Sequence, residues 1–126
     1  MARGGSPFYL VDLPGFGFAR GKREELEAVV REYFGRADAR IAALLLIDSR
    51  HPGLMSDVEA WRWLDSAAEQ TAIVATKIDK LSRSERQRAI RTNEAVFDHA
   101  VVPVSAETGE GLEELWKLID KLTRPR

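Results

Sequence analysis

The stretch that decides the fold runs Ala72-Ile73-Val74-Ala75-Thr76-Lys77-Ile78-Asp79. Its continuous apolar first half is typical of a β-strand that is buried on both faces of a sheet. Its polar second half follows at once, at the edge where open α/β sheets bind ligands. We therefore predict a parallel sheet whose carboxyl edge carries a functional loop at residues 76–79.

Three similar apolar runs occupy residues 8–11, 43–47 and 101–104, and longer amphipathic segments separate them. This alternation predicts a three-layer α/β fold with a largely parallel sheet buried on both faces. Pro103 cannot donate a hydrogen bond to a neighbouring strand, so we expect the last strand to lie at an edge. A chain of 126 residues has room for one domain, residues 1–126.

Each predicted strand leads into a helix, and right-handed crossovers place all the carboxyl ends of the strands on one edge. Asp12, Asp48, Asp79 and Ser105 are therefore expected to meet there. The helices themselves are predicted from apolar residues at helical spacing. These residues are Leu26, Val29, Val30, Tyr33 and Phe34 in the first helix, Val58, Trp61 and Leu64 in the second, and Leu112, Leu115, Trp116 and Ile119 in the last.

Two helix starts are predicted from capping boxes. Ser56 with Glu59, and Ser82 with Glu85, have the three-residue spacing at which the two side chains satisfy each other's backbone N–H groups.

Composition excludes several classes of protein. Hydrophobic residues make up 44% and charged residues 31% of the chain, as in an ordinary globular domain. The net charge of -1 gives no overall attraction to nucleic acid or to anionic membranes, and the lack of cysteine excludes thiolate metal sites. The apolar runs are far shorter than the roughly 20 residues of a membrane span. We expect a cytoplasmic protein with no membrane partner.

Several conspicuous side chains are expected to have structural roles. Trp61, Trp63 and Trp116 are predicted to pack in or at the rim of the core, with stacking on RNA as the alternative. His51 is predicted to be a loop residue rather than a catalyst, and His99 a surface residue. The arginines of residues 83–91 are expected to form a solvated helix face, with contact to RNA as the alternative.

The first candidate site, Asp12-Leu13-Pro14-Gly15, ends the predicted strand at residues 8–11. In a GTPase such an aspartate holds Mg²⁺, and the glycine N–H meets the γ-phosphate. A Pro-Gly turn that merely ends a strand explains these four residues equally well. The following Gly15-Phe16-Gly17-Phe18-Ala19 favours a binding role, because aromatic residues on a glycine-rich loop are costly to expose.

The second candidate site is Thr76-Lys77-Ile78-Asp79. An ionised Asp79 offers only acceptors, which match the paired N1–H and N2–H₂ donors of guanine, whereas adenine presents an acceptor at N1. Lys77 would lay its aliphatic stem along the nucleotide, and Thr76 would tie the loop to its neighbours. The alternative is a capped exit from a strand.

The third candidate site is Ser105-Ala106-Glu107, after the last strand. The backbone N–H of Ala106 would face guanine O6, and Ser105 would stabilise the turn. This motif carries little information alone, but three motifs in this order indicate a guanine-nucleotide site.

Longer stretches around these motifs resemble the EngB (YihA/YsxC) family of bacterial GTPases. They are residues 12–19 (DLPGFGFA), 48–52 (DSRHP), 76–81 (TKIDKL) and 105–111 (SAETGEG). The resemblance implies a Ras-like G domain of the TRAFAC class that binds GTP or GDP and Mg²⁺. It further implies a role in assembly of the large ribosomal subunit, with rRNA as a partner, and in cell-division septation.

The chain departs from that family because no GxxxxGK[ST] phosphate loop occurs in its 126 residues. We therefore expect weak binding of GTP and Mg²⁺, and we assign no catalytic residue. The sequence leaves open whether the chain is an inactive fragment of a GTPase or a non-enzymatic adaptor that retains a partner surface. In a Ras-like sheet a further strand lies between those ending at Asp12 and Ile47, so self-association through this gap is also expected.

Overall fold

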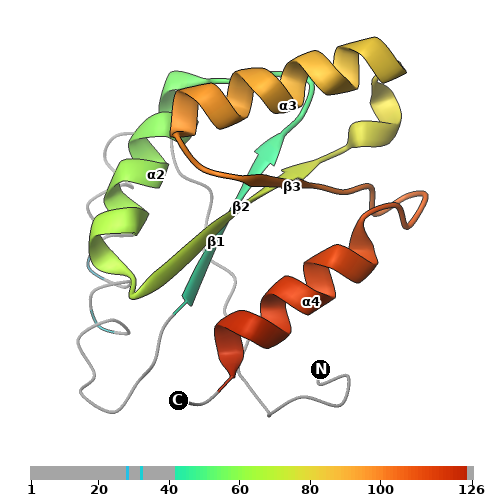
Figure 1. Cartoon of the computed structure of the whole chain (residues 1–126). Coiled ribbons are helices and arrows are strands. Elements are labelled where there is room, and N and C mark those ends of the chain that lie inside the picture. Colours follow the sequence, from blue (N-terminus) through green and yellow to red (C-terminus); the bar gives the residue numbers. More distant parts are fainter. Residues whose placement is uncertain (1–27, 29–31, 33–41, 125–126) are drawn as a thin grey trace.

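The computed structural model describes Ala28, Glu32 and residues 42–124. Along this part of the chain, strands and helices alternate as the sequence predicts (Figure 1). The elements are β1 (Ala42–Asp48), α2 (Met55–Ala67), β2 (Gln70–Thr76), the 3₁₀ turn η1 (Ile78–Lys80), α3 (Arg83–Phe97), β3 (Val101–Pro103) and α4 (Leu112–Thr123).

The predicted strand at residues 8–11 lies outside the described residues, as do Asp12 and Gly15. The predicted helix at residues 26–34 is described only at Ala28 and Glu32, which are both helical. Those predictions therefore stay predictions.

The described sheet is parallel and has the order β1-β2-β3. Asp48 pairs with Thr76, and Ala75 pairs with Pro103, so the three strands end together at one edge. The β3 strand lies at the edge of this sheet, as Pro103 predicts. Immediately after it, the Val104 N–H donates to the Ala75 carbonyl at 2.8 Å and closes the ladder.

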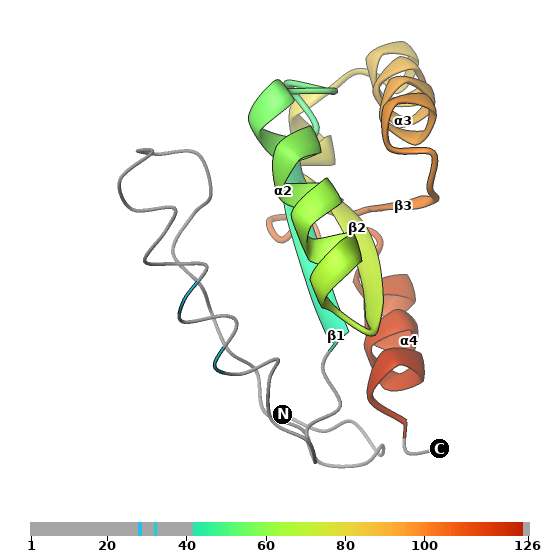
Figure 2. The ribbon, with the colours of Figure 1, turned by 90° about the vertical axis from the view of Figure 1, so that its left-hand side faces the viewer.

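The core lies between the sheet and helices α2 and α3. Trp61 of α2 is 7% exposed and meets the ring of Phe97 of α3 edge-on, with the ring centroids 6.4 Å apart. The predicted apolar face of α2 is confirmed, since Val58 and Leu64 are also buried in this core. Helix α4 lies on the other side of β3 from α3 in both views (Figures 1 and 2).

Burial on both faces holds for β2 but is wrong for β1. In β2, the consecutive residues Ile73 and Val74 are 0% and 1% exposed. In β1, Ile47 is buried with the α2 side of the sheet, whereas Leu46, which points to the opposite face, is 62% exposed. Side chains alternate between the two faces of a strand, and no element among residues 42–124 buries Leu46.

One of the two predicted capping boxes is confirmed. The Ser82 hydroxyl accepts from the Glu85 N–H at 3.2 Å, and the Glu85 carboxylate accepts from the Ser82 N–H at 2.9 Å. The other is wrong, because α2 already begins at Met55 and Leu54 occupies the cap position without a side-chain hydrogen bond.

The turn before α2 is tied to α3. The Gly53 N–H donates to the amide oxygen of the buried Asn93 at 3.0 Å. Helix α2 begins two residues later at Met55, so Ser56 falls within its first turn.

Candidate functional site

The described parts of the predicted site meet at the carboxyl edge of the sheet. Asp48 ends β1, the loop at residues 76–79 follows β2, and Ser105 lies two residues beyond β3. The structure thus brings together the second and third candidate motifs, while the first motif, with Asp12 and Gly15, lies outside the described residues.

Thr76 joins the ends of β1 and β2. Its hydroxyl donates to the Ile47 carbonyl at 3.0 Å, and its own carbonyl accepts from the Ser49 N–H at 3.0 Å. The side chain of Thr76 therefore ties this loop to its neighbour.

The turn after Thr76 places Asp79. Lys77 has a left-handed backbone (φ 63°), and its carbonyl accepts from the Lys80 N–H at 3.0 Å, which starts the 3₁₀ turn. Ile78 is 2% exposed and anchors the turn beneath. As a result, the side chain of Asp79 faces the loop after β3.

Asp79 and Ser105 form a direct contact between the second and third candidate motifs. The Ser105 hydroxyl donates to Asp79 Oδ1 at 2.8 Å and accepts from the Thr108 N–H at 3.1 Å. This hydroxyl, helped by the nearby Lys80 ammonium, holds the pKa of Asp79 below its usual value despite partial burial. The carboxylate is thus ionised near neutral pH, and it keeps acceptor sites for further donors.

The loop of the third motif is closed by its own backbone. The Ser105 N–H donates to the Glu110 carbonyl at 2.8 Å, and the Ser105 carbonyl accepts from the Gly109 N–H at 2.9 Å. Ser105 is fully buried at the base of this loop, whereas Ala106 is exposed beside it. The position of Ala106 is therefore set by the buried serine before it.

Asp48 is the centre of a charged cluster that the sequence reasoning placed at this edge without assigning it a role. Its carboxylate accepts from Arg50 Nε at 3.1 Å and Nη2 at 2.8 Å, and Lys77 Nζ lies 3.6 Å from Oδ2. The hydrogen bonds from Arg50 hold the pKa of Asp48 well below its usual range. The two-residue spacing of Asp48 and Arg50 is the feature of the sequence from which this ion pair could have been predicted.

Arg86 has a different environment from the one predicted. Arg83, Arg88 and Arg91 are exposed, as expected of a solvated face, but Arg86 is partly buried and turns toward the site. Its guanidinium contacts Glu110 at 2.6 Å and donates to the Ile78 carbonyl at 3.0 Å. No local pattern could reveal a contact between residues 24 positions apart.

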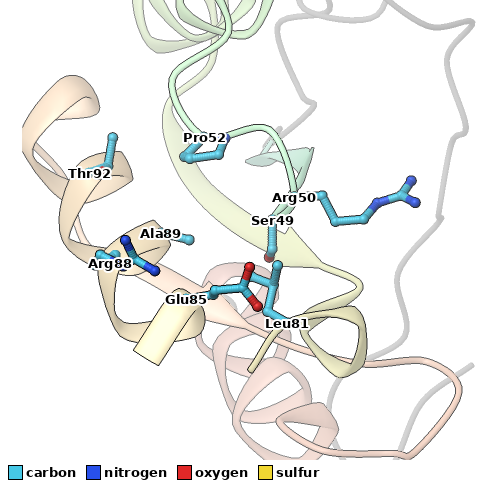
Figure 3. A pocket seen from close by; sticks show the side chains of 8 residues that line it. All are labelled: Ser49, Arg50, Pro52, Leu81, Glu85, Arg88, Ala89 and Thr92. Carbon is cyan, nitrogen blue, oxygen red and sulfur yellow. The ribbon is translucent and has the colours of Figure 1, made fainter. Parts of the chain in front are cut away.

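A separate cavity of about 180 Å³ lies between the loop after β1 and helix α3 (Figure 3). Ser49, Glu85 and Arg88 contribute to its wall, while the side chain of Arg50 points away from its centre. None of the predicted guanine-binding residues lines it. The candidate site is therefore the pair of loops around Asp79, and this cavity is not part of it.

The remaining predictions concern surface residues, metals and membranes. His51 lies in the loop after β1 and His99 is exposed, both as predicted, and the centroid of the His99 ring lies 5.0 Å from that of Trp61. Within the described residues, no three His, Cys, Asp or Glu side chains gather in a way that could hold a metal ion. In the same residues, no helix has the length and apolar character needed to span a membrane.

Comparison with known proteins agrees with this geometry. No protein-family model matches the chain. The chain is 37% identical over 121 residues to a protein named "Probable GTP-binding protein EngB" of Anoxybacillus flavithermus, and 38% identical over 121 residues to one of the same name from Chlorobaculum tepidum. These alignments cover 90% and 92% of this chain but 63% of each relative, so the chain spans less than two-thirds of their length.

Solved structures show the same fold. A crystal structure of a probable GTP-binding protein EngB superposes with a TM-score of 0.71 at 24% identity, covering 91% of this chain and 76% of the other. Apo elongation factor SelB of Methanococcus maripaludis superposes with a TM-score of 0.68, covering 92% of this chain and 25% of the other. The predicted α/β fold of P-loop GTPases is confirmed, and over about 90% of its length the chain is similar in sequence to proteins named EngB.

Proposed function

We propose that this chain binds the guanine base of GTP or GDP through the loop at residues 76–79 and the loop that begins at Ser105. The observation that carries the proposal is the 2.8 Å hydrogen bond from the Ser105 hydroxyl to Asp79, which joins the two loops and fixes the carboxylate. The names of the relatives, which describe probable GTP-binding proteins, support the same conclusion.

The residues at this edge fit guanine in their chemistry. The ionised Asp79 accepts from the N1–H and N2–H₂ groups of the base, and the exposed Ala106 offers its backbone N–H toward O6. The half-exposed side chain of Lys77 extends along the nucleotide. Mg²⁺ and the γ-phosphate would depend on Asp12 and Gly15, as the family resemblance implies.

The test is a change of base preference in Asp79→Asn. This substitution exchanges one acceptor for a donor, so it should weaken GMP and improve the relative binding of XMP, whose O2 replaces the amino donor. A bidentate base contact is worth about 1–3 kcal/mol, which sets the expected change at roughly fivefold to a hundredfold. Glu114→Gln, a change of an exposed carboxylate on α4 outside both loops, is the control.

The measurement is a titration followed by NMR chemical shifts, which records millimolar affinities. An unchanged ratio of GMP to XMP affinity in Asp79→Asn would rule out the assignment of Asp79 to the base.

The finer biological role follows from the resemblance to the EngB family. We propose that the complete protein hydrolyses GTP slowly and acts in assembly of the large ribosomal subunit, with an associated role in septation. The exposed Arg83, Arg88 and Arg91 on α3 offer cations for phosphate contacts. Replacing all three arginines by glutamine should weaken co-sedimentation with large ribosomal subunits. It should also make the remaining binding less sensitive to salt concentration. Unchanged co-sedimentation would exclude this face and favour an adaptor that uses another surface.

A further inference from the structure

Arg86 connects the two loops of the candidate site from outside. Its Nη1 contacts the Glu110 carboxylate at 2.6 Å, and its Nη2 donates to the Ile78 carbonyl at 3.0 Å. Ile78 directly precedes Asp79, and the Glu110 carbonyl accepts from the Ser105 N–H. The planar guanidinium of Arg86 on α3 therefore contacts both loops. Its contacts are with Ile78 and Glu110, and each of these is bonded directly to a residue that would face the base or support one that does.

The two loops have few other contacts with each other. The Ser105 hydroxyl bonds to Asp79, the Ile78 N–H donates to the Val104 carbonyl at 3.3 Å, and Lys80 Nζ lies 3.4 Å from Glu107. The ion pair of Lys80 with Glu107 is exposed to solvent, so it contributes little to the relative position of the two loops. Arg86 differs because its donors have a rigid planar arrangement and its side chain is 27% exposed.

The environment of Arg86 carries a cost to the stability of the fold. Its Nε is buried and has no hydrogen-bond partner in the described part of the chain, which carries a desolvation cost. The carboxylate that it contacts is 54% exposed, so the ion pair adds little to global stability. An apolar side chain at this position would avoid the cost. The contacts of Arg86 thus favour a role in geometry.

We propose that Arg86 is a positioning residue that sets selectivity for guanine by holding the loop at residues 76–79 in register with the loop at residues 105–110. The inference rests on the proposed function. Selectivity depends on where the Asp79 carboxylate stands relative to the Ala106 N–H, because guanine presents its donors and its O6 along one rigid edge. Contacts of the Lys77 stem with the nucleotide tolerate a small displacement. Loss of Arg86 should therefore reduce discrimination between bases more than affinity in general.

The first experiment follows amide hydrogen exchange in the unliganded full chain and needs no ligand. Arg86→Ala should speed exchange about tenfold at the Thr108 and Ser105 amides, which close the second loop, and leave the β1–β2 ladder unchanged. Arg88→Ala, on the exposed part of the same helix, is the matched control. Uniformly faster exchange, or no change at Thr108, would overturn the positioning role.

The second experiment measures base preference by NMR titration with GMP and AMP. Arg86→Ala should reduce the ratio of GMP to AMP affinity about tenfold, Arg86→Lys should restore only part of it because lysine lacks the planar pair of donors, and Arg88→Ala should leave it unchanged. Glu110→Gln should act in the same direction as Arg86→Ala, and the double variant should show less than the sum of the two effects.

Asp79→Asn distinguishes failure of this inference from failure of the proposed function. If Asp79→Asn changes the base preference and Arg86→Ala does not, the positioning role is wrong while guanine binding stands. If neither substitution changes it, or if the wild-type chain does not prefer GMP, both proposals fall.

Discussion

At the scale of single residues, the carboxylates at the carboxyl edge of the sheet are held in place by short hydrogen bonds within and between the loops. Asp48 accepts hydrogen bonds from the backbone N–H and the guanidinium of Arg50, and Lys77 lies beside it. Asp79 is held in the same way by the Ser105 hydroxyl. Both carboxylates have a lowered pKa, so both are ionised where the protein would meet a nucleotide.

Asp48→Asn should lower the free energy of unfolding by about 1 kcal/mol at pH 7, since it weakens a partly exposed, charge-assisted pair. The pKa of Asp48 is lowered in the folded state, so its contribution is complete above the ordinary pKa of 3.8 and is lost as the pH falls further. Urea unfolding of both proteins at several pH values measures this. The difference in the free energy of unfolding between the two proteins should become smaller below about pH 4. A difference that does not depend on pH would contradict a stabilising role of the ionised Asp48.

Asp57 is a useful control because its pKa is shifted in the opposite direction from that of Asp48. Burial, together with the negative charge of Asp48, raises the pKa of Asp57, so its charge is unfavourable in the folded state. The destabilisation is present above the raised pKa and disappears as the pH falls below it. Asp57→Asn should therefore leave stability at pH 7 unchanged or slightly increase it.

At the scale of the elements, backbone conformation at the start of α4 determines where this helix docks. Gly111 occupies the cap position with φ 81°, and a Cβ there would overlap the Pro103 carbonyl of β3. The helix that follows has no fully buried residue, and its apolar face, which includes Leu115 and Trp116, is half-buried. The start of α4 is therefore fixed by a close approach of two backbones.

Gly111→Ala should destabilise the protein by about 3 kcal/mol or more, because it adds a steric overlap to the cost of a left-handed backbone. Gly109→Ala is the matched control, since Gly109 has φ 84° but open space where the Cβ would stand. It should cost about 1 kcal/mol from the backbone alone. Denaturant unfolding of the two variants gives the difference, and equal losses would show that the contact with Pro103 is not limiting.

At the scale of the whole molecule, the described residues combine the two loops proposed to bind the base with a sheet that the described helices cover in part. The loops that would recognise the base are built, whereas no phosphate loop of the form GxxxxGK[ST] occurs in the 126 residues. Leu46 on β1 is 62% exposed, although its neighbours Leu45 and Ile47 pack in the core. These two features lead to two predictions about the purified chain.

The purified chain should bind GTP weakly and should not hydrolyse it. A phosphate loop supplies about four charge-assisted hydrogen bonds of roughly 1.5–3 kcal/mol each, so a site without one lacks about 6–12 kcal/mol. This difference weakens a nanomolar site by about four to nine orders of magnitude, to tens of micromolar at best. Calorimetry with GTP and Mg²⁺, followed by an assay of phosphate release, measures both properties. A dissociation constant of about 1 μM or tighter, or turnover that depends on Asp12, would refute the prediction.

The purified chain should also self-associate through β1, because no described strand pairs with its outer edge and no described element covers Leu46. Sedimentation should show a larger mass at higher concentration, and Leu46→Lys should shift the equilibrium toward the monomer. Leu54→Lys changes an exposed leucine outside the sheet and should have little effect. A monomer at all concentrations, without binding of a hydrophobic dye, would show that β1 is satisfied within the chain.

The sequence by itself determined the order of the elements, the edge strand at Pro103 and the capping box at Ser82, because these depend on residues close together in the chain. It also identified the motifs that meet at the sheet edge. Only the tertiary structure decided that α2 begins at Met55 without a capping box, that Leu46 is exposed, and that Arg86 turns from the solvent toward Glu110 and Ile78. The position of Arg86 depends on Glu110, 24 residues away, and the exposure of Leu46 depends on which elements cover the sheet, and local spacing encodes neither.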